Sequence, residues 1–456
     1  MLRAARPARL AVAGLLALVL AAIVSVPARA DTVRDAQLWV LDAVSAPAAW
    51  SVTQGQGVTV AVIDSGVNPG VSDLTGSVIT GPDLTGVHTP PADPNWGVHG
   101  TWMASLIAGH GHAGGGSGIM GVAPQSKVLS IRVVTDRHDP GFAAYERESD
   151  SQVQNALAEA INYAIKRHVG VISMSLGYGE PSAVVRSALQ DALSHDIVVV
   201  ASSGNSGDSV GARTTGQAPY SFPADYPGVL GVAAVSRGGS TAGFSSDNLS
   251  VQVAAPGVNV PAQGRDGGYW LVSGTSPACA LTAGVAALIK ARYPGLAPAL
   301  VIRAITTSTQ HRPPGGYDDK VGFGTVDAAA SLAAAANLAS ALHGPPGTAT
   351  TVHFGGGAAA VPPVPVPPRG ATGLVVASLF ALVCLAVAAV TGTRLMALRR
   401  TRSRGHHAAD ARQPPPVWPG PRVHATWPGT EDSGWGDEQA VGSAEQGAGW
   451  RPGPGS

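Results

Sequence analysis

The sequence has few residues that could crosslink it. It contains two cysteines in 456 residues, Cys279 and Cys384. Cys384 falls within a long apolar run and Cys279 within the main part of the chain, so we do not expect them to pair. The fold must therefore rely on its hydrophobic core. Cys279 follows Ser276 by three residues. It could be a second nucleophile, but the role of a small buried residue is favoured.

The sequence also has little charge of either sign. Charged residues make up 13% of the chain and the formal net charge is +0. Nothing in this balance suggests a polyanion, so nucleic acid is not expected as a partner. His110 and His112, in GHGHAGGGSG, are candidate metal ligands, but no carboxylates stand at calcium-loop or zinc spacing. We expect a glycine-rich loop there, and neither a metal nor another cofactor.

The first 30 residues have the pattern of a secretory signal peptide. Three arginines precede an apolar run, and Ala28-Arg29-Ala30 provides a cleavage site before Asp31. An uncleaved anchor helix is the weaker alternative, because the cleavage site is well formed.

A second apolar segment, residues 372–393, is predicted to cross a membrane once. Its residues 373–392 carry no charge, and at about 1.5 Å per residue they span a hydrocarbon core of ~30 Å. Arginines crowd the following residues but not the preceding ones, which places the C-terminus in the cytoplasm. A buried helix of a soluble protein is the weaker alternative. The arginines are Arg394, Arg399, Arg400, Arg402 and Arg404.

These two segments divide the chain. An N-terminal extension occupies residues 31–54, and its Leu38–Leu41 stretch and Trp50 are too apolar for a free tail. Residues 55–340 are long enough for one large domain. Residues 341–371 form a Pro/Gly-rich linker, and residues 394–456 a tail expected to be disordered.

Within the large domain, buried strands alternate with amphipathic helices. Helical apolar spacing appears in residues 151–168 and 182–195. This alternation is typical of a parallel sheet covered by helices on both faces. The predicted strands, which are short, apolar and rich in β-branched residues, are 58–66, 127–134, 170–177, 196–205 and 228–235.

Polar residues follow several of these strands. They are Asp64 after the first, Ser175-Leu176-Gly177 at the end of the third, and Asn205 after the fourth. Because the carboxyl ends of parallel strands lie on one edge, this edge is the expected site of chemistry.

Ser276 stands directly before Pro277 at the start of a predicted buried helix. Proline is tolerated at the first helical position, so we expect Ser276 to precede the first turn. There it is either an ordinary N-cap or a nucleophile whose oxyanion the free N–H groups stabilise.

His99, in WGVHGTWMASLIAG, completes a set of four polar residues with Asp64, Asn205 and Ser276. Each residue alone has a simpler interpretation. Asp64 could be a capping carboxylate and His99 is one of 13 histidines, while Asn205 could be a turn residue and Ser276 a helix cap. Together they supply what nucleophilic acyl transfer needs: a serine, a base, a group that orients the base and a side-chain amide donor.

The segments VAVIDSGV, HGT, ASSGN and SGTS resemble, in order and spacing, the four signature blocks of the subtilisin-like serine proteases. GFGTVDAAASL resembles the segment that closes that domain. With the signal peptide, linker and membrane helix, the chain looks like a mycosin, a membrane-anchored subtilase associated with type VII secretion. The resemblance implies an α/β, subtilisin-like three-layer fold with a central parallel sheet, plus one C-terminal transmembrane helix.

The resemblance also implies roles for the residues that match. Ser276 corresponds to the nucleophile, His99 to the general base and Asp64 to the residue that orients the histidine. Asn205 and the N–H of Ser276 correspond to the oxyanion hole. Ser175, Leu176 and Gly177 correspond to the strand that pairs with a peptide substrate.

The chain departs from the family pattern in three places. Ala280 stands where the family usually has proline, as if that proline had moved to 277. Trp102 replaces the second histidine of the usual HGTH. Finally, mycosins commonly have extracytoplasmic disulfides and this chain cannot form one internally. The first two departures affect the shape of the site and the third affects stability.

The sequence thus predicts an outward-facing, membrane-anchored serine endopeptidase that acts on protein or peptide substrates beside a type VII secretion complex. The alternative is a scaffold that stabilises such a complex, with catalysis secondary or absent. The complete set of Asp64, His99, Asn205 and Ser276 favours the enzyme, because a scaffold needs no oxyanion donor.

Overall fold

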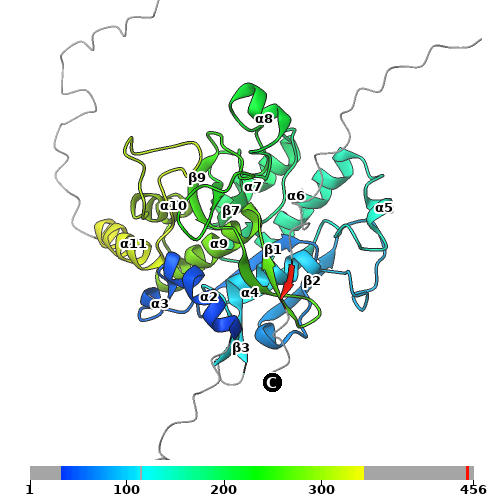
Figure 1. Cartoon of the computed structure of the whole chain (residues 1–456), viewed down its shortest axis with the longest axis horizontal. Helices are drawn as coiled ribbons and strands as arrows, with labels where there is room; N and C mark the ends of the chain where they lie inside the picture. The colour runs from blue at the N-terminus through cyan, green and yellow to red at the C-terminus, as the bar shows by residue number, and fades with distance from the viewer. Residues whose placement is uncertain (1–31, 113–115, 344–447, 451–456) are drawn as a thin grey trace, which may run out of the picture. The chain divides into compact units, whose positions relative to one another are not determined.

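A seven-stranded parallel sheet forms the middle layer of the structure, a computed structural model that describes residues 32–112, 116–343 and 448–450. The strand order is β2-β5-β1-β6-β7-β8-β9 (Figure 1). This confirms the predicted α/β fold with a central parallel sheet. The strands are β1 (Thr59–Asp64), β2 (Val78–Asp83), β5 (Lys127–Arg132), β6 (Val171–Met174), β7 (Val198–Ser202), β8 (Leu230–Val235) and β9 (Val251–Pro256).

Helices cover both faces of the sheet. Two core clusters lie on its two sides, one containing residues of α4 and α9 and the other residues of α6 and α7. The helices are α2 (Thr32–Ala43), α3 (Ala46–Ala49), α4 (Val98–Ala108), α5 (Phe142–Tyr145), α6 (Asp150–Lys166), α7 (Ala183–Ser194), α8 (Val210–Thr215), α9 (Thr275–Arg292), α10 (Pro298–Thr307) and α11 (Ala328–His343), with a 3₁₀ turn η1 (Ser72–Leu74).

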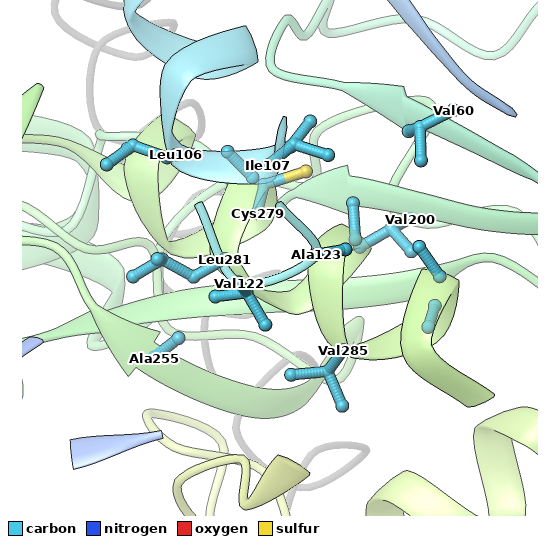
Figure 2. Close-up of a cluster of buried hydrophobic side chains, with 14 of the residues drawn as sticks. Val60, Leu106, Ile107, Val122, Ala123, Val200, Ala255, Cys279, Leu281 and Val285 are labelled. Atoms are coloured by element: carbon cyan, nitrogen blue, oxygen red, sulfur yellow. The ribbon is translucent and has the colours of Figure 1, made fainter. Parts of the chain in front are cut away.

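The side chains of β1 alternate between the two faces of the sheet, and this alternation determines the face on which Asp64 lies. Val60 and Val62 belong to the cluster of α4 and α9, whereas Ala61 and Ile63 belong to the cluster of α6 and α7. Successive side chains of a strand point to opposite faces, so Asp64 faces the same way as Val62. Asp64 thus lies at the carboxyl end of an interior strand, β1, facing α4 and α9. Figure 2 shows Val60 in this packing with Leu106, Val122, Val200, Cys279 and Val285.

Helix α9 is the buried centre of this face, as predicted. Every residue from Thr275 to Lys290 is buried. Small residues let the helix approach its neighbours closely. A Cβ atom on Gly284 would lie 2.6 Å from the Cβ of Val122, nearer than real contacts allow.

The start of α9 differs from the expectation. The helix begins at Thr275 after Gly274, so Ser276 is its second residue and Pro277 its third; the predicted N-cap position for Ser276 was wrong. The first four N–H groups of a helix have no intrahelical acceptor, so a proline at the third position still sacrifices no helical hydrogen bond.

The N-terminal extension packs into the core of the large domain. Val40 and Leu41 of α2 and Ala49 of α3 belong to the same cluster as α4 and α9. Gln37 is buried: its amide donates to Met120 O (2.6 Å) and accepts from Met120 N (2.9 Å). The extension is therefore part of the folded domain, as its apolar composition predicts.

All five predicted strands exist, but other elements went unpredicted. Among the strands, these are the edge strands β2 and β9 and five short strands joined in three antiparallel pairings. β3 (His110–His112) pairs with β4 (Ser117–Met120), so His110 and His112 lie on a strand and not in the expected loop. β10 (Val260–Gln263) pairs with β11 (Tyr269–Val272), and β12 (Ala448–Trp450), in the tail expected to be disordered, adds to β11.

The helices that the structure describes include none with both the length and the apolar character to cross a membrane. The predicted signal peptide, linker and membrane helix lie outside the described residues.

Candidate active site

Asp64 and His99 form a buried pair at the carboxyl end of β1. The Nδ1 of His99 lies 2.8 Å from Asp64 Oδ1 and 3.0 Å from Oδ2. Asp64 Oδ1 also accepts from the N–H of Ser65 at 2.7 Å. With Nδ1 held by a carboxylate, the free ring nitrogen is Nε2, the arrangement that a general base requires.

Two glycines bring α4 close enough to β1 for this contact. Gly97, the residue before the helix, has a φ of 72°, which favours glycine. A Cβ atom on Gly100 would lie 2.2 Å from the carbonyl oxygen of Gly66. The glycine of the HGT segment is therefore required because α4 packs directly on the chain that follows β1.

Two carboxylates, those of Asp64 and Asp136, influence the pKa of His99. Burial lowers the pKa of His99, but the charge and hydrogen bond of Asp64 and the charge of Asp136 raise it, and the net direction is upward. The site thus favours the imidazolium that forms when His99 accepts a proton.

Ser276 lies in the first turn of α9, on the same sheet face as Asp64. Its Oγ is 3.5 Å from the carbonyl oxygen of Ser175, and the Oγ of Ser175 donates to the carbonyl oxygen of Ser276 at 3.2 Å. Among the hydrogen bonds of the described residues, none joins Ser276 Oγ to His99. Catalytic hydrogen bonds are often long without substrate and tighten when it binds.

Asn205 is held against the start of α9. Its Oδ1 accepts from the N–H of Thr275 (2.9 Å) and from the Thr275 hydroxyl (3.0 Å). Both contacts occupy the oxygen, so the Nδ2 group remains as the donor. This suits an oxyanion donor better than a turn residue.

Ser175, Leu176 and Gly177 continue the chain beyond the end of β6. Ser175 contacts Ser276, as described, and Tyr178 forms a bridge with Phe222. A Cβ atom on Gly177 would lie 2.2 Å from Ser221 Oγ, so a larger residue would collide there. The structure therefore brings the expected substrate strand beside the expected nucleophile.

Two of the departures from the family pattern, Trp102 and Ala280, lie in the buried part of the fold. Trp102 is buried and contacts His99 edge-on, with ring centroids 6.3 Å apart, and Trp270 at 6.0 Å. Ala280 is fully buried within α9. Trp102 thus supports one side of His99 where the family usually has a second histidine.

Cys279 is a structural residue. It is fully buried, its Sγ lies 3.6 Å from the carbonyl oxygen of Met174, and burial raises its pKa to about 12. A thiol with such a pKa is protonated at neutral pH, which argues against a second nucleophile.

His110 and His112 make protein contacts. His112 Nδ1 lies 2.7 Å from Asp73 Oδ1, and His110 Nε2 lies 3.0 Å from Thr75 O. Over the described ranges, no group of three or more His, Cys, Asp and Glu side chains could hold a metal ion.

Sequence reasoning missed two residues of the site, Thr275 and Asp136. Thr275 orients Asn205, and Asp136 accepts hydrogen bonds from the first turn of α4. The sequence does carry a signal for Asp136, which follows the predicted strand 127–134 and so belongs to the same carboxyl-end edge as Asp64.

Comparison with known proteins matches this arrangement to one family. A model of the subtilase family matches residues 55–324. Subtilisin DY of Bacillus licheniformis is 32% identical over 277 residues, covering 61% of this chain and 92% of that protein. Mycosin-3 of Mycobacterium tuberculosis is 32% identical over 403 residues, covering 76% and 82%. The structure of the MycP3 protease from the type VII (ESX-3) secretion system has a TM-score of 0.55 and 30% identity, covering 64% of this chain and 87% of that one.

The family match spans more than half of the chain and includes Asp64, His99, Asn205 and Ser276. The expected resemblance is thereby confirmed. The chain belongs to the subtilase family, is a serine endopeptidase, and is related to the mycosins of type VII secretion.

Proposed function

We propose that the chain cleaves peptide bonds through Ser276, His99 and Asp64, on the outer side of a membrane to which it is anchored, in association with a type VII secretion complex. The observation that carries the proposal is the buried Asp64–His99 pair on the sheet face that also presents the first turn of α9.

The chemistry follows from these groups. His99 Nε2 accepts the Ser276 hydroxyl proton as Oγ attacks the substrate carbonyl carbon. The oxyanion receives hydrogen bonds from Asn205 Nδ2 and from the N–H of Ser276, which has no intrahelical acceptor at this position. His99 then protonates the leaving amine, and water releases the acyl group by the same route.

Ser175, Leu176 and Gly177 are proposed to bind the substrate backbone as an added strand. Their position beside Ser276 supports this role. A substrate held there presents its carbonyl group to the first turn of α9.

Membrane anchoring and the link to secretion rest on the sequence and the relatives. Residues 372–393 are the proposed anchor, which leaves the tail in the cytoplasm. MycP1, a structural relative, is described as an essential component of the type VII (ESX-1) secretion system. That description also fits a structural role in the complex, so the scaffold remains the second candidate.

Labelling with a fluorophosphonate separates the two candidates. The purified ectodomain should react at Ser276, and the Ser276→Ala variant should not, because the reagent needs an activated serine. A scaffold without catalytic competence would give equal, background labelling of both proteins. Thermal melting of both checks that the variant is folded.

A further inference from the structure

Asp136 is a second buried carboxylate next to His99. It lies in the segment after β5 and is 6% exposed. Its Oδ2 accepts from the N–H of Val98 (2.8 Å) and its Oδ1 from the N–H of His99 (3.1 Å). These are two of the N–H groups that the start of a helix leaves without a partner.

The N-terminus of helix α4 is not capped by the side chain of its own N-cap residue. The residue before it is Gly97, which has no side chain to accept a hydrogen bond. Asp136, 37 residues away in the chain, takes that place. The backbone of His99 is thus fixed by Asp136 and its ring by Asp64.

Ser65 contacts both carboxylates, Asp64 through its backbone N–H and Asp136 through its side chain. Its hydroxyl accepts from the N–H of Gly100 at 3.1 Å and forms a hydrogen bond with Asp136. Three consecutive N–H groups in the first turn of α4, those of Val98, His99 and Gly100, therefore donate to side chains outside the helix.

The charged groups around His99 come from several elements. Asp64 lies on β1 and Asp136 after β5. Helix α9, which packs against α4, carries the neutral Cys279 thiol and Ser276 hydroxyl. Arg132, at the end of β5, donates to the carbonyl oxygen of Ser65. Its charge is balanced by ion pairs with Asp83 (2.6 Å) and Asp139 (2.8 Å).

The pKa of Asp136 is raised above the ordinary value of a carboxyl group. Burial raises the pKa of Asp136 to about 6, although the charge of His99 opposes this shift. Conversely, the charge of Asp136 raises the pKa of His99. The two groups therefore titrate as a coupled pair.

We propose that Asp136 is a positioning residue of the active site, which holds His99 by capping α4 and adds to Asp64 a second negative charge that increases the proton affinity of His99. The inference rests on the proposed role of His99 as general base.

The experiment compares Asp136→Asn with Asp136→Ala by the pH dependence of kcat/KM on a peptide substrate. Asparagine keeps one of the two acceptor oxygens for the helix but removes the charge, so deprotonation of His99 becomes easier. The acid limb of the pH profile of kcat/KM should move to lower pH by about one unit. Alanine also removes the cap, so kcat should fall about 10- to 100-fold with little change in KM, because the base is displaced.

The matched control is Glu159→Gln, which removes one exposed carboxylate from α6 on the other face of the sheet. Its acid limb should stay in place. If Asp136→Asn unfolds, as judged by its melting temperature, Asp136→Ser offers a smaller neutral acceptor.

The outcomes are distinct. If the wild type is active and the acid limb of the folded neutral variants does not move, the electrostatic role is overturned. If Asp136→Ala folds and keeps full kcat, the positioning role is overturned. If the wild type itself neither cleaves peptides nor reacts with a fluorophosphonate, the proposed function fails.

Discussion

Thr275 determines the orientation of the Asn205 side-chain amide. Its N–H and hydroxyl both donate to Asn205 Oδ1, so the amide nitrogen is left to donate to the proposed oxyanion. The donor is thus oriented before substrate binds, and it requires no rearrangement during the reaction.

Asn205→Ala should leave the fold intact and lower kcat about 10²- to 10³-fold, a range known from a subtilisin rather than derived from this structure. KM should change little, because an oxyanion donor acts mainly in the transition state. Steady-state kinetics on a peptide substrate measure both constants. An unchanged kcat with a raised KM would indicate a substrate-binding role instead.

At the scale of elements, α2 and α3 behave as part of the domain and not as an appendage. Trp50 Nε1 donates to Val122 O at 2.9 Å, and Ala328 N donates to Val44 O at 2.8 Å. The 24 residues 31–54 are too few for a stable domain of their own, so their order depends on these contacts.

Leu41→Ala should lower the free energy of unfolding by about 2–5 kcal/mol, because the side chain is 2% exposed and its loss leaves a cavity. Leu38→Ala is the matched control: Leu38 lies on the same helix but is 45% exposed, so its change should stay within about 0.5 kcal/mol. Urea denaturation measures both. Equal, small effects would mean that α2 does not contribute to the core.

The same packing predicts how the protein matures. An extension that belongs to the core is expected to stay, so the mature protein should begin at Asp31 and be active without further cleavage. Mass spectrometry of the N-terminus of the isolated protein checks this. A start near Gly55, with activity appearing only after that cut, would show that the chain is a zymogen.

At the scale of the whole molecule, two arrangements of the C-terminal tail exclude each other. Strand β12 pairs with β11, which requires residues 448–450 on the same side as the catalytic domain. The proposed topology places these residues across a membrane from β11. In an anchored chain the β11 edge would then lack this strand.

A protease added to intact cells decides between them. With the proposed topology, the protease removes the catalytic domain and leaves an epitope at the tail protected, because the tail is cytoplasmic. Loss of the tail epitope would place it outside and agree with the β11–β12 pairing. Lysed cells serve as the control, since both parts should be digested there.

What the sequence by itself determined is the part that local patterns encode. The short apolar run of β1, rich in β-branched residues, indicated a buried strand and placed Asp64 at its end, and the apolar spacing around residues 281–293 indicated a buried helix. Side-chain periodicity follows directly from strand and helix geometry, so these elements are readable without knowledge of their partners. The four signature segments then identified the family.

The tertiary structure alone decided how distant segments meet. It showed that Asp136 caps α4, that Thr275 orients Asn205 and that Trp102 supports His99. A helix cap or an amide orientation is a contact between side chains and backbone groups far apart in sequence, and periodicity carries no information about such pairs. It also showed that α9 begins at Thr275. The sequence could not predict this start, because proline is tolerated at each position of the first turn and does not indicate which one it occupies.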